Sequence, residues 1–82
     1  MRIYLQAPEE TGKRPRFYQL ILQQDMLGGW TLLRESGYQG SAGALKRDHY
    51  SDYERAMSQL LILRDKQLQS GYKIMFIQGD EE

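Results

Sequence analysis

Two stretches of alternating residues, joined by a short glycine-containing connection, constrain the fold of this chain more than any other feature. In Arg16 to Gln24, and again in Trp30 to Glu35, successive side chains separate into two sets, as they do on the two faces of a β-strand. Residues 25–29 between them read Asp-Met-Leu-Gly-Gly, and glycines of this kind serve turns between paired strands. The sequence therefore predicts an antiparallel hairpin, whose first strand directs one face at the core with Tyr18, Leu20 and Leu22.

Three further segments are predicted to be strands. Ile3 to Ala7 is short and apolar-rich, and we expect it at an edge of the sheet, followed by a loop over Pro8 to Pro15. Ala44 to Tyr50 is more polar and follows a connection that contains three glycines. Tyr72 to Ile77 returns to apolar, β-prone residues and is either a short strand, which we favour, or an apolar segment lying against a helix.

One amphipathic helix is predicted between the fourth and fifth strands. Ser51-Asp52-Tyr53-Glu54 fits a capping box, in which the Ser51 hydroxyl accepts a hydrogen bond from the Glu54 amide at the helix start. Gly71 suits the left-handed residue that ends a helix. The helical face expected to pack on the sheet carries Tyr53, Ala56, Met57, Leu60, Leu61, Leu63 and Leu68.

These elements predict the fold class α+β, with an antiparallel β-sheet of four to five strands and one α-helix packed across a face. We expect residues 1–79 to form a single domain and the acidic residues 80–82 to form a C-terminal tail. A chain of 82 residues buries a small core, so its nine aromatic residues are expected to supply much of it. We assign Tyr18, Trp30, Tyr53 and Phe76 to that core and expect the Tyr38 ring to be exposed.

The residue types present exclude several classes of function. The chain has no cysteine and a single histidine, His49, which leaves no thiolate nucleophile and no four-ligand zinc site. We predict no catalytic residue, no metal and no cofactor, and therefore a protein that is not an enzyme. No apolar stretch approaches the roughly 20 residues of a membrane span, and the N-terminus lacks the apolar region of a secretory signal. A cytoplasmic protein that makes no membrane contact is expected.

Charge leaves room for a weak interaction with nucleic acid. Eleven Lys and Arg balance eleven Asp and Glu, which is unlike the large basic surplus of strong non-specific nucleic-acid binders. Three of the acidic residues are the last three of the chain, so residues 1–79 carry eleven positive and eight negative charges, a net +3. A modest positive field is compatible with phosphate binding that weakens as salt concentration rises.

The candidate site is an edge of the sheet beside the connection that contains Gly37, Gly40 and Gly43. Four residues there could offer phosphate contacts beside a ring that stacks on a base: Arg34, Tyr38, Lys46 and Arg47. Gly37 and Gly40 are expected to set the geometry of the loop. The alternative is that these charges solubilise the strands and pair with Glu35 and Asp48.

Arg16-Phe17-Tyr18 is followed by residues 29–35, and then by a glycine loop, a polar strand, a helix with Ala56 and Lys66, and Gly71-Tyr72. The order and spacing of these segments, over residues 3 to 73, resemble the WGR domain, especially its small stand-alone bacterial members. This resemblance implies an antiparallel sheet with one helix and, by analogy with poly(ADP-ribose) polymerases, contact with DNA. This chain has Ser36-Gly37-Tyr38 where the family has Trp-Gly-Arg, so the family's Trp and Arg contacts do not carry over.

Two functions follow as expectations. The first is a non-catalytic WGR-like module that binds nucleic acid, in particular DNA, weakly and in a salt-sensitive way through the glycine-loop edge. The alternative is a protein–protein interaction module that has lost nucleic-acid binding and uses the same edge or the outer helix face near Ile62, with a homodimer as a special case.

Overall fold

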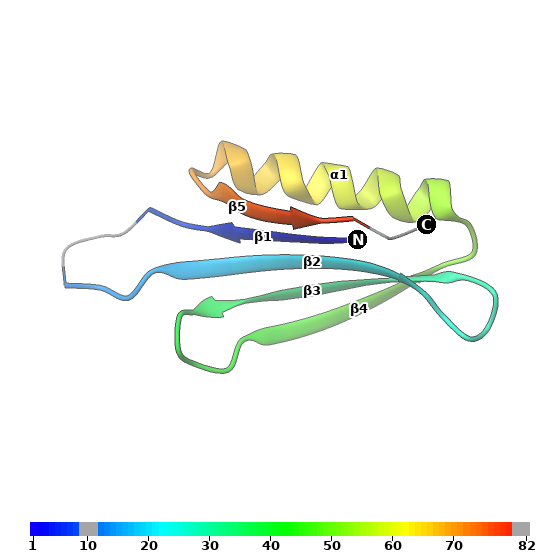
Figure 1. Ribbon diagram of the computed structural model, residues 1–82, viewed down its shortest axis with the longest axis horizontal. Coiled ribbons are helices and arrows are strands. Elements are labelled where there is room, and N and C mark those ends of the chain that lie inside the picture. The colour runs from blue at the N-terminus through cyan, green and yellow to red at the C-terminus, as the bar shows by residue number, and fades with distance from the viewer. Residues whose placement is uncertain (9–11, 80–82) are drawn as a thin grey trace.

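The computed structural model describes residues 1–8 and 12–79 and contains five strands and one helix. The bounds are Arg2–Gln6 for β1, Arg16–Gln24 for β2, Trp30–Tyr38 for β3, Ala44–Tyr50 for β4, Tyr53–Gln69 for α1 and Lys73–Gln78 for β5 (Figure 1). All strand pairs are antiparallel. The fold is therefore α+β, as predicted, and the fifth strand predicted at the C-terminal end is present.

The sheet has the strand order β4-β3-β2-β1-β5, which places β1 in its interior. Ile3 of β1 pairs with Leu20 of β2 on one side and with Ile77 of β5 on the other. The prediction that β1 is an edge strand was wrong, because the chain returns after the helix and β5 pairs with the side of β1 that β2 leaves open. The two edges are β4 and β5.

The helix runs along one face of the sheet and contacts β2, β3 and β4 (Figure 1). Between helix and sheet lies a core of aliphatic side chains: Ile3, Leu5, Leu20, Leu22, Leu32, Ala56, Leu60 and Leu63. The predicted periodicities account for Leu20 and Leu22 of β2 and for Ala56, Leu60 and Leu63 of the helix, since their burial follows the two-residue and 3.6-residue repeats. No helix in the described part of the chain is long and apolar enough to cross a membrane.

The aromatic residues lie at the margins of this core or on the opposite face of the sheet, which corrects the prediction that they supply much of it. Tyr18 and Trp30 pack against the core from outside and are only partly buried. Tyr53 is 41% exposed and meets Trp30 edge to face, with ring centroids 4.9 Å apart. Phe76 is 42% exposed and lies on the opposite face of the sheet. The space between one helix and a short sheet is filled by branched aliphatic side chains, so the rings close its rim.

The N-cap of the helix lies one residue later than predicted. Asp52 is the N-cap, in an extended conformation, and its carboxylate accepts a hydrogen bond from the Arg55 amide at 2.8 Å. Ser51 and Asp52 are both competent capping residues, and a carboxylate also interacts favourably with the helix N-terminus. At the other end Gly71 has φ +98 and its amide bonds to the carbonyl of Leu68, which confirms the predicted left-handed residue.

The face of the sheet opposite the helix carries a row of rings. Tyr4 of β1 stacks on Phe17 of β2 and on Phe76 of β5, with centroid distances of 6.0 and 5.3 Å and planes within 8°. A Cβ built on Gly43 would lie 3.1 Å from the Phe17 ring, and one on Gly37 would lie 2.9 Å from the Gly43 Cα atom. Among the described residues no helix covers this face, which we call the open face.

Candidate nucleic-acid interface

The four predicted site residues divide between the two faces of the sheet. Arg34 pairs with Lys46 across β3 and β4, so both project on the helix side, as Leu32 does. Arg47 pairs with Leu33 and projects on the open face. Tyr38 lies on the helix side, but four residues further along β3 than Arg34, which is about 13 Å at the rise of a strand. The structure thus brings Arg34 and Lys46 together and separates both from Tyr38 and Arg47.

Arg34 forms an ion pair with Asp48 of the neighbouring strand. Its guanidinium lies 3.1 Å from the Asp48 carboxylate, and its side chain is 28% exposed. Its Nε atom is buried without a hydrogen-bond partner. Burial raises the pKa of the neighbouring Tyr18 hydroxyl, and the positive charge of Arg34 partly opposes that rise. Arg34 therefore meets the alternative expectation of an ion pair with Asp48, whereas Lys46 is exposed.

The basic neighbours of Tyr38 are not the predicted Arg34, Lys46 and Arg47. Arg16 is its pairing partner at the start of β2, and Lys13 and Arg14 precede that strand. With Tyr38 these three side chains line a pocket of about 390 Å³, which is completed by Ala7, Pro8, Ser70 and Gly71. We call this the basic pocket. It lies at the end of the molecule that also holds the β3–β4 and α1–β5 connections (Figure 1).

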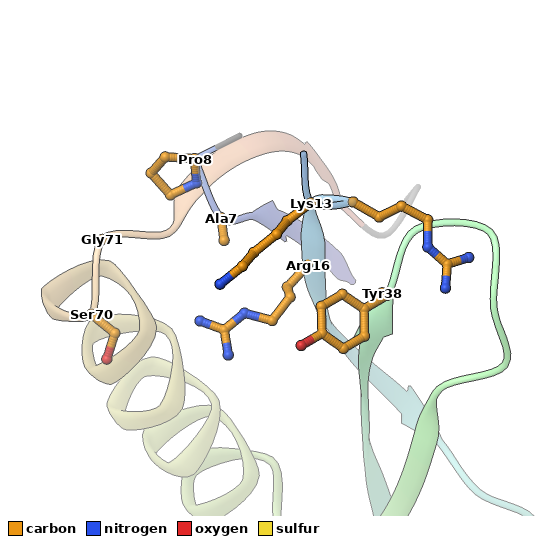
Figure 2. Close-up of a pocket in the computed structure, with 8 residues that line it drawn as sticks. Ala7, Pro8, Lys13, Arg16, Tyr38, Ser70 and Gly71 are labelled. Atoms are coloured by element: carbon orange, nitrogen blue, oxygen red, sulfur yellow. The ribbon is translucent and has the colours of Figure 1, made fainter. Parts of the chain in front are cut away.

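Figure 2 shows that two of the charged side chains, Lys13 and Arg16, converge in the basic pocket. Lys13 and Arg16 extend into the space between the strands and the end of the helix, and the Tyr38 hydroxyl points the same way. Arg14 reaches the loop after β3, where its guanidinium would lie 3.9 Å from a Cβ on Gly40. None of the described residues that line the pocket is acidic. Because the C-terminal end of a helix carries partial negative charge, it favours cations beside Ser70 and Gly71.

The loop after β3 holds Tyr38 in position. The Ser41 amide and hydroxyl both donate to the Tyr38 carbonyl, at 3.1 and 2.9 Å, and the Gln39 amide donates to the Pro15 carbonyl at 2.8 Å. The Gln39 side chain donates to the Tyr4 hydroxyl. Gly40 has φ +83, a conformation that favours glycine. Gly37 serves packing, since its neighbour Gly43 leaves no room for a side chain.

The single histidine, on β4, contacts the β2–β3 turn at the other end of the sheet. His49 Nδ1 lies 2.7 Å from the Asp25 carboxylate, which also accepts hydrogen bonds from the Leu27 and Gly29 amides at 2.9 Å each. The hydrogen bond from the Gly29 amide is the main cause that lowers the pKa of Asp25, and the nearby His49 ring adds to it. The described residues contain no group of three or more His, Cys, Asp or Glu side chains able to hold a metal ion.

Comparisons with protein-family models, with curated proteins and with solved structures give no match to this chain. The interpretation of the site therefore depends on the geometry and charge of the basic pocket.

A signal for the basic pocket was already present in the hairpin. If residues 25–29 form the turn, Gln24 faces Trp30, and counting back along both strands puts Arg16 opposite Tyr38. The approach of Lys13 and of the helix end depends on long-range contacts, for which the local sequence carries no comparable signal.

Proposed function

We propose that this protein is a non-catalytic, WGR-like module that binds nucleic acid, in particular DNA, through phosphate contacts at the basic pocket. The observation that carries the proposal is that Lys13, Arg14 and Arg16 line one pocket beside a half-exposed Tyr38. Guanidinium groups match phosphate oxygens in a planar, bidentate geometry, and a tyrosine ring can stack on a base or sugar beside them. The pocket is adjacent to the glycine loop that the family resemblance singled out.

The proposal moves the phosphate contacts from Arg34 to Arg16. Arg34 is engaged with Asp48, and using it for a ligand would leave the carboxylate without its partner. Arg16 is exposed and is directed into the pocket (Figure 2). Lys46 lies further along the same side of the sheet, where it would contact a longer nucleic acid. Arg47, on the open face, is not part of this contact surface.

A weak, salt-dependent affinity is expected from the small number of cations. Each phosphate contact contributes to the slope of log affinity against log salt, so a surface with three cations gives a slope of about −2 to −3 on duplex DNA. This slope is much shallower than that of proteins that make many phosphate contacts. The half-exposed ring adds a contribution that salt does not screen.

The test is fluorescence anisotropy with a labelled short DNA duplex, blunt or nicked, and with a matched single strand, at about 50 and 200 mM salt. We expect saturable binding by the wild-type protein that weakens at the higher salt concentration. Arg16→Ala should weaken binding several-fold and reduce the magnitude of the salt slope by about 1. Tyr38→Ala should weaken binding without changing the slope.

Arg55→Ala is the matched control. Arg55 is also an arginine, its side chain is 78% exposed, and it lies in the first turn of the helix, about 20 Å along the helix axis from Ser70. It should leave affinity and slope near the wild-type values. Equal losses in the Arg16 and Arg55 variants would show a diffuse charge effect and refute the basic pocket. No binding by the wild-type protein at the lower salt concentration would refute the function.

A further inference from the structure

The two edges of the sheet differ in the chemistry that they present to solvent. The β4 edge has four consecutive polar or charged residues, Lys46 to His49. The β5 edge has four consecutive apolar residues, and every residue of β5 is exposed. The exposed fractions are 36% for Ile74, 55% for Met75, 42% for Phe76 and 54% for Ile77. Charged edge strands resist pairing with other chains, and apolar ones favour it.

The apolar surface of β5 extends over both faces of the sheet. Ile77 pairs with Ile3 and Ile74 pairs with Leu5, and these two β1 residues are buried on the helix side. Phe76 pairs with Tyr4 and joins the row of rings on the open face. Met75 is the additional residue where the register shifts. Both apolar layers of the domain therefore continue to the β5 edge, and no described segment pairs with its outer side.

The order of residues in β5 is self-complementary about its centre. An antiparallel copy centred between Met75 and Phe76 sets Ile74 opposite the partner's Ile77, with both side chains on the helix side. Met75 then faces the partner's Phe76. Because each copy of β5 contains the same extra residue, Met75, the two strands have equal numbers of residues between the paired isoleucines. Lys73 faces the partner's Gln78, so no like charges oppose one another. A shift of one residue would set helix-side residues against open-face residues.

We propose that β5 is the interface for a second copy of this chain, which pairs antiparallel with it and extends the sheet from five to ten strands. Backbone hydrogen bonds along β5 hold the two copies together, and the isoleucines and the Phe76 ring bury their exposed area against the same residues of the partner. The contact is one strand long, so it is a small interface and the dissociation constant should be micromolar. The β4 edge, with its charges, stays in solvent. This inference is independent of the proposed function.

The first experiment is sedimentation velocity of the full chain, without nucleic acid, over a range of about 5 to 500 μM, which brackets a micromolar dissociation constant. As the protein concentration increases, we expect the average sedimenting mass to rise from that of one chain toward that of two chains. Met75→Lys puts a charge at the centre of the contact and should raise the dissociation constant at least about tenfold. Leu45→Lys is the matched control, because Leu45 is 51% exposed on the opposite edge strand, and it should leave association unchanged.

The second experiment locates the contact even if a lysine variant folds poorly. The chain has no cysteine, so Met75→Cys carries its only thiol. In the proposed pairing the two Cα atoms lie about 6 Å apart, from a strand spacing of about 5 Å and an offset of one residue. Diamide should therefore cross-link this variant much faster than Leu45→Cys at equal concentration.

Three results would overturn the proposal. The first is a wild-type protein that remains a single chain up to the highest concentration, which would leave β5 for a different partner. The second is a Leu45→Lys variant that weakens association as much as Met75→Lys does. The third is equal cross-linking of the two cysteine variants. Failure of nucleic-acid binding is a separate result, since Met75→Lys should keep the DNA affinity of the wild-type protein and Arg16→Ala should keep its association.

Discussion

Replacing Leu60 by alanine tests the packing of the helix on the sheet. Leu60 is fully buried between the helix and the strands and belongs to the continuous aliphatic core. The substitution removes three carbon atoms, for which the lost transfer free energy alone is about 2.5 kcal/mol. The cavity left behind adds to this, so the free energy of unfolding should fall by about 3 kcal/mol, within the usual range for Leu→Ala of roughly 2–5 kcal/mol. In a domain of this size that corresponds to a Tm lower by roughly 12–24 °C.

The assay is urea unfolding followed by circular dichroism and by the fluorescence of Trp30, with the slope against urea concentration compared between variants. Ile62→Ala is the control, because Ile62 lies on the same helix and is 59% exposed. It should change the free energy of unfolding by less than about 0.5 kcal/mol. A loss below about 1 kcal/mol for Leu60→Ala, or equal losses for both variants, would refute the assignment of the buried helix face.

Three further predictions concern the turns and the Arg34 ion pair. The pKa of Asp25 in the folded protein lies below its ordinary value, so its contribution to stability is present above about pH 4 and is lost as the pH falls through the folded pKa. Urea titrations between about pH 2 and 6 should therefore show that acid lowers the free energy of unfolding less for Asp25→Asn than for the wild-type protein. Gly40→Ala should cost about 1 kcal/mol because its φ is +83, whereas Gly79→Ala, with no positive φ and open space around it, should be near neutral by thermal unfolding. Arg34→Ala should lower the free energy of unfolding by about 1 kcal/mol, because it removes packing and the contact with Asp48. Lys46 is exposed, so Lys46→Ala should lower it by less than about 0.5 kcal/mol. Equal losses for the two variants would contradict the structural role of Arg34.

The predicted local elements were largely confirmed, because their signals lie within a few residues. The predicted bounds of the second and fourth strands match the structure, and the third strand runs beyond Glu35 to Tyr38. Gly71 ends the helix as expected. The N-cap was wrong by one residue, since Ser51 and Asp52 are neighbouring residues that can both accept the capping hydrogen bond and the final choice depends on backbone conformation.

Part of the candidate site could also be predicted from the alternation of side chains along the strands. Lys46 and Arg47 are adjacent in one strand, so they must project on opposite faces and cannot both join Arg34 on one surface. The pairing of Arg16 with Tyr38 follows from the length of the hairpin turn. Neither inference needs tertiary structure: the first separates Arg47 from Arg34, and the second places Arg16 beside Tyr38.

The sequence by itself determined the fold class, the hairpin and the buried face of the helix, because residue periodicity acts over a few positions. The tertiary structure decided that β1 is interior, that β5 is an edge, and that the helix end completes the basic pocket. It also decided that the core is aliphatic and that Phe76 lies on the open face. These outcomes depend on which distant segments bury their surfaces together, and that choice is made by the packing of the whole chain.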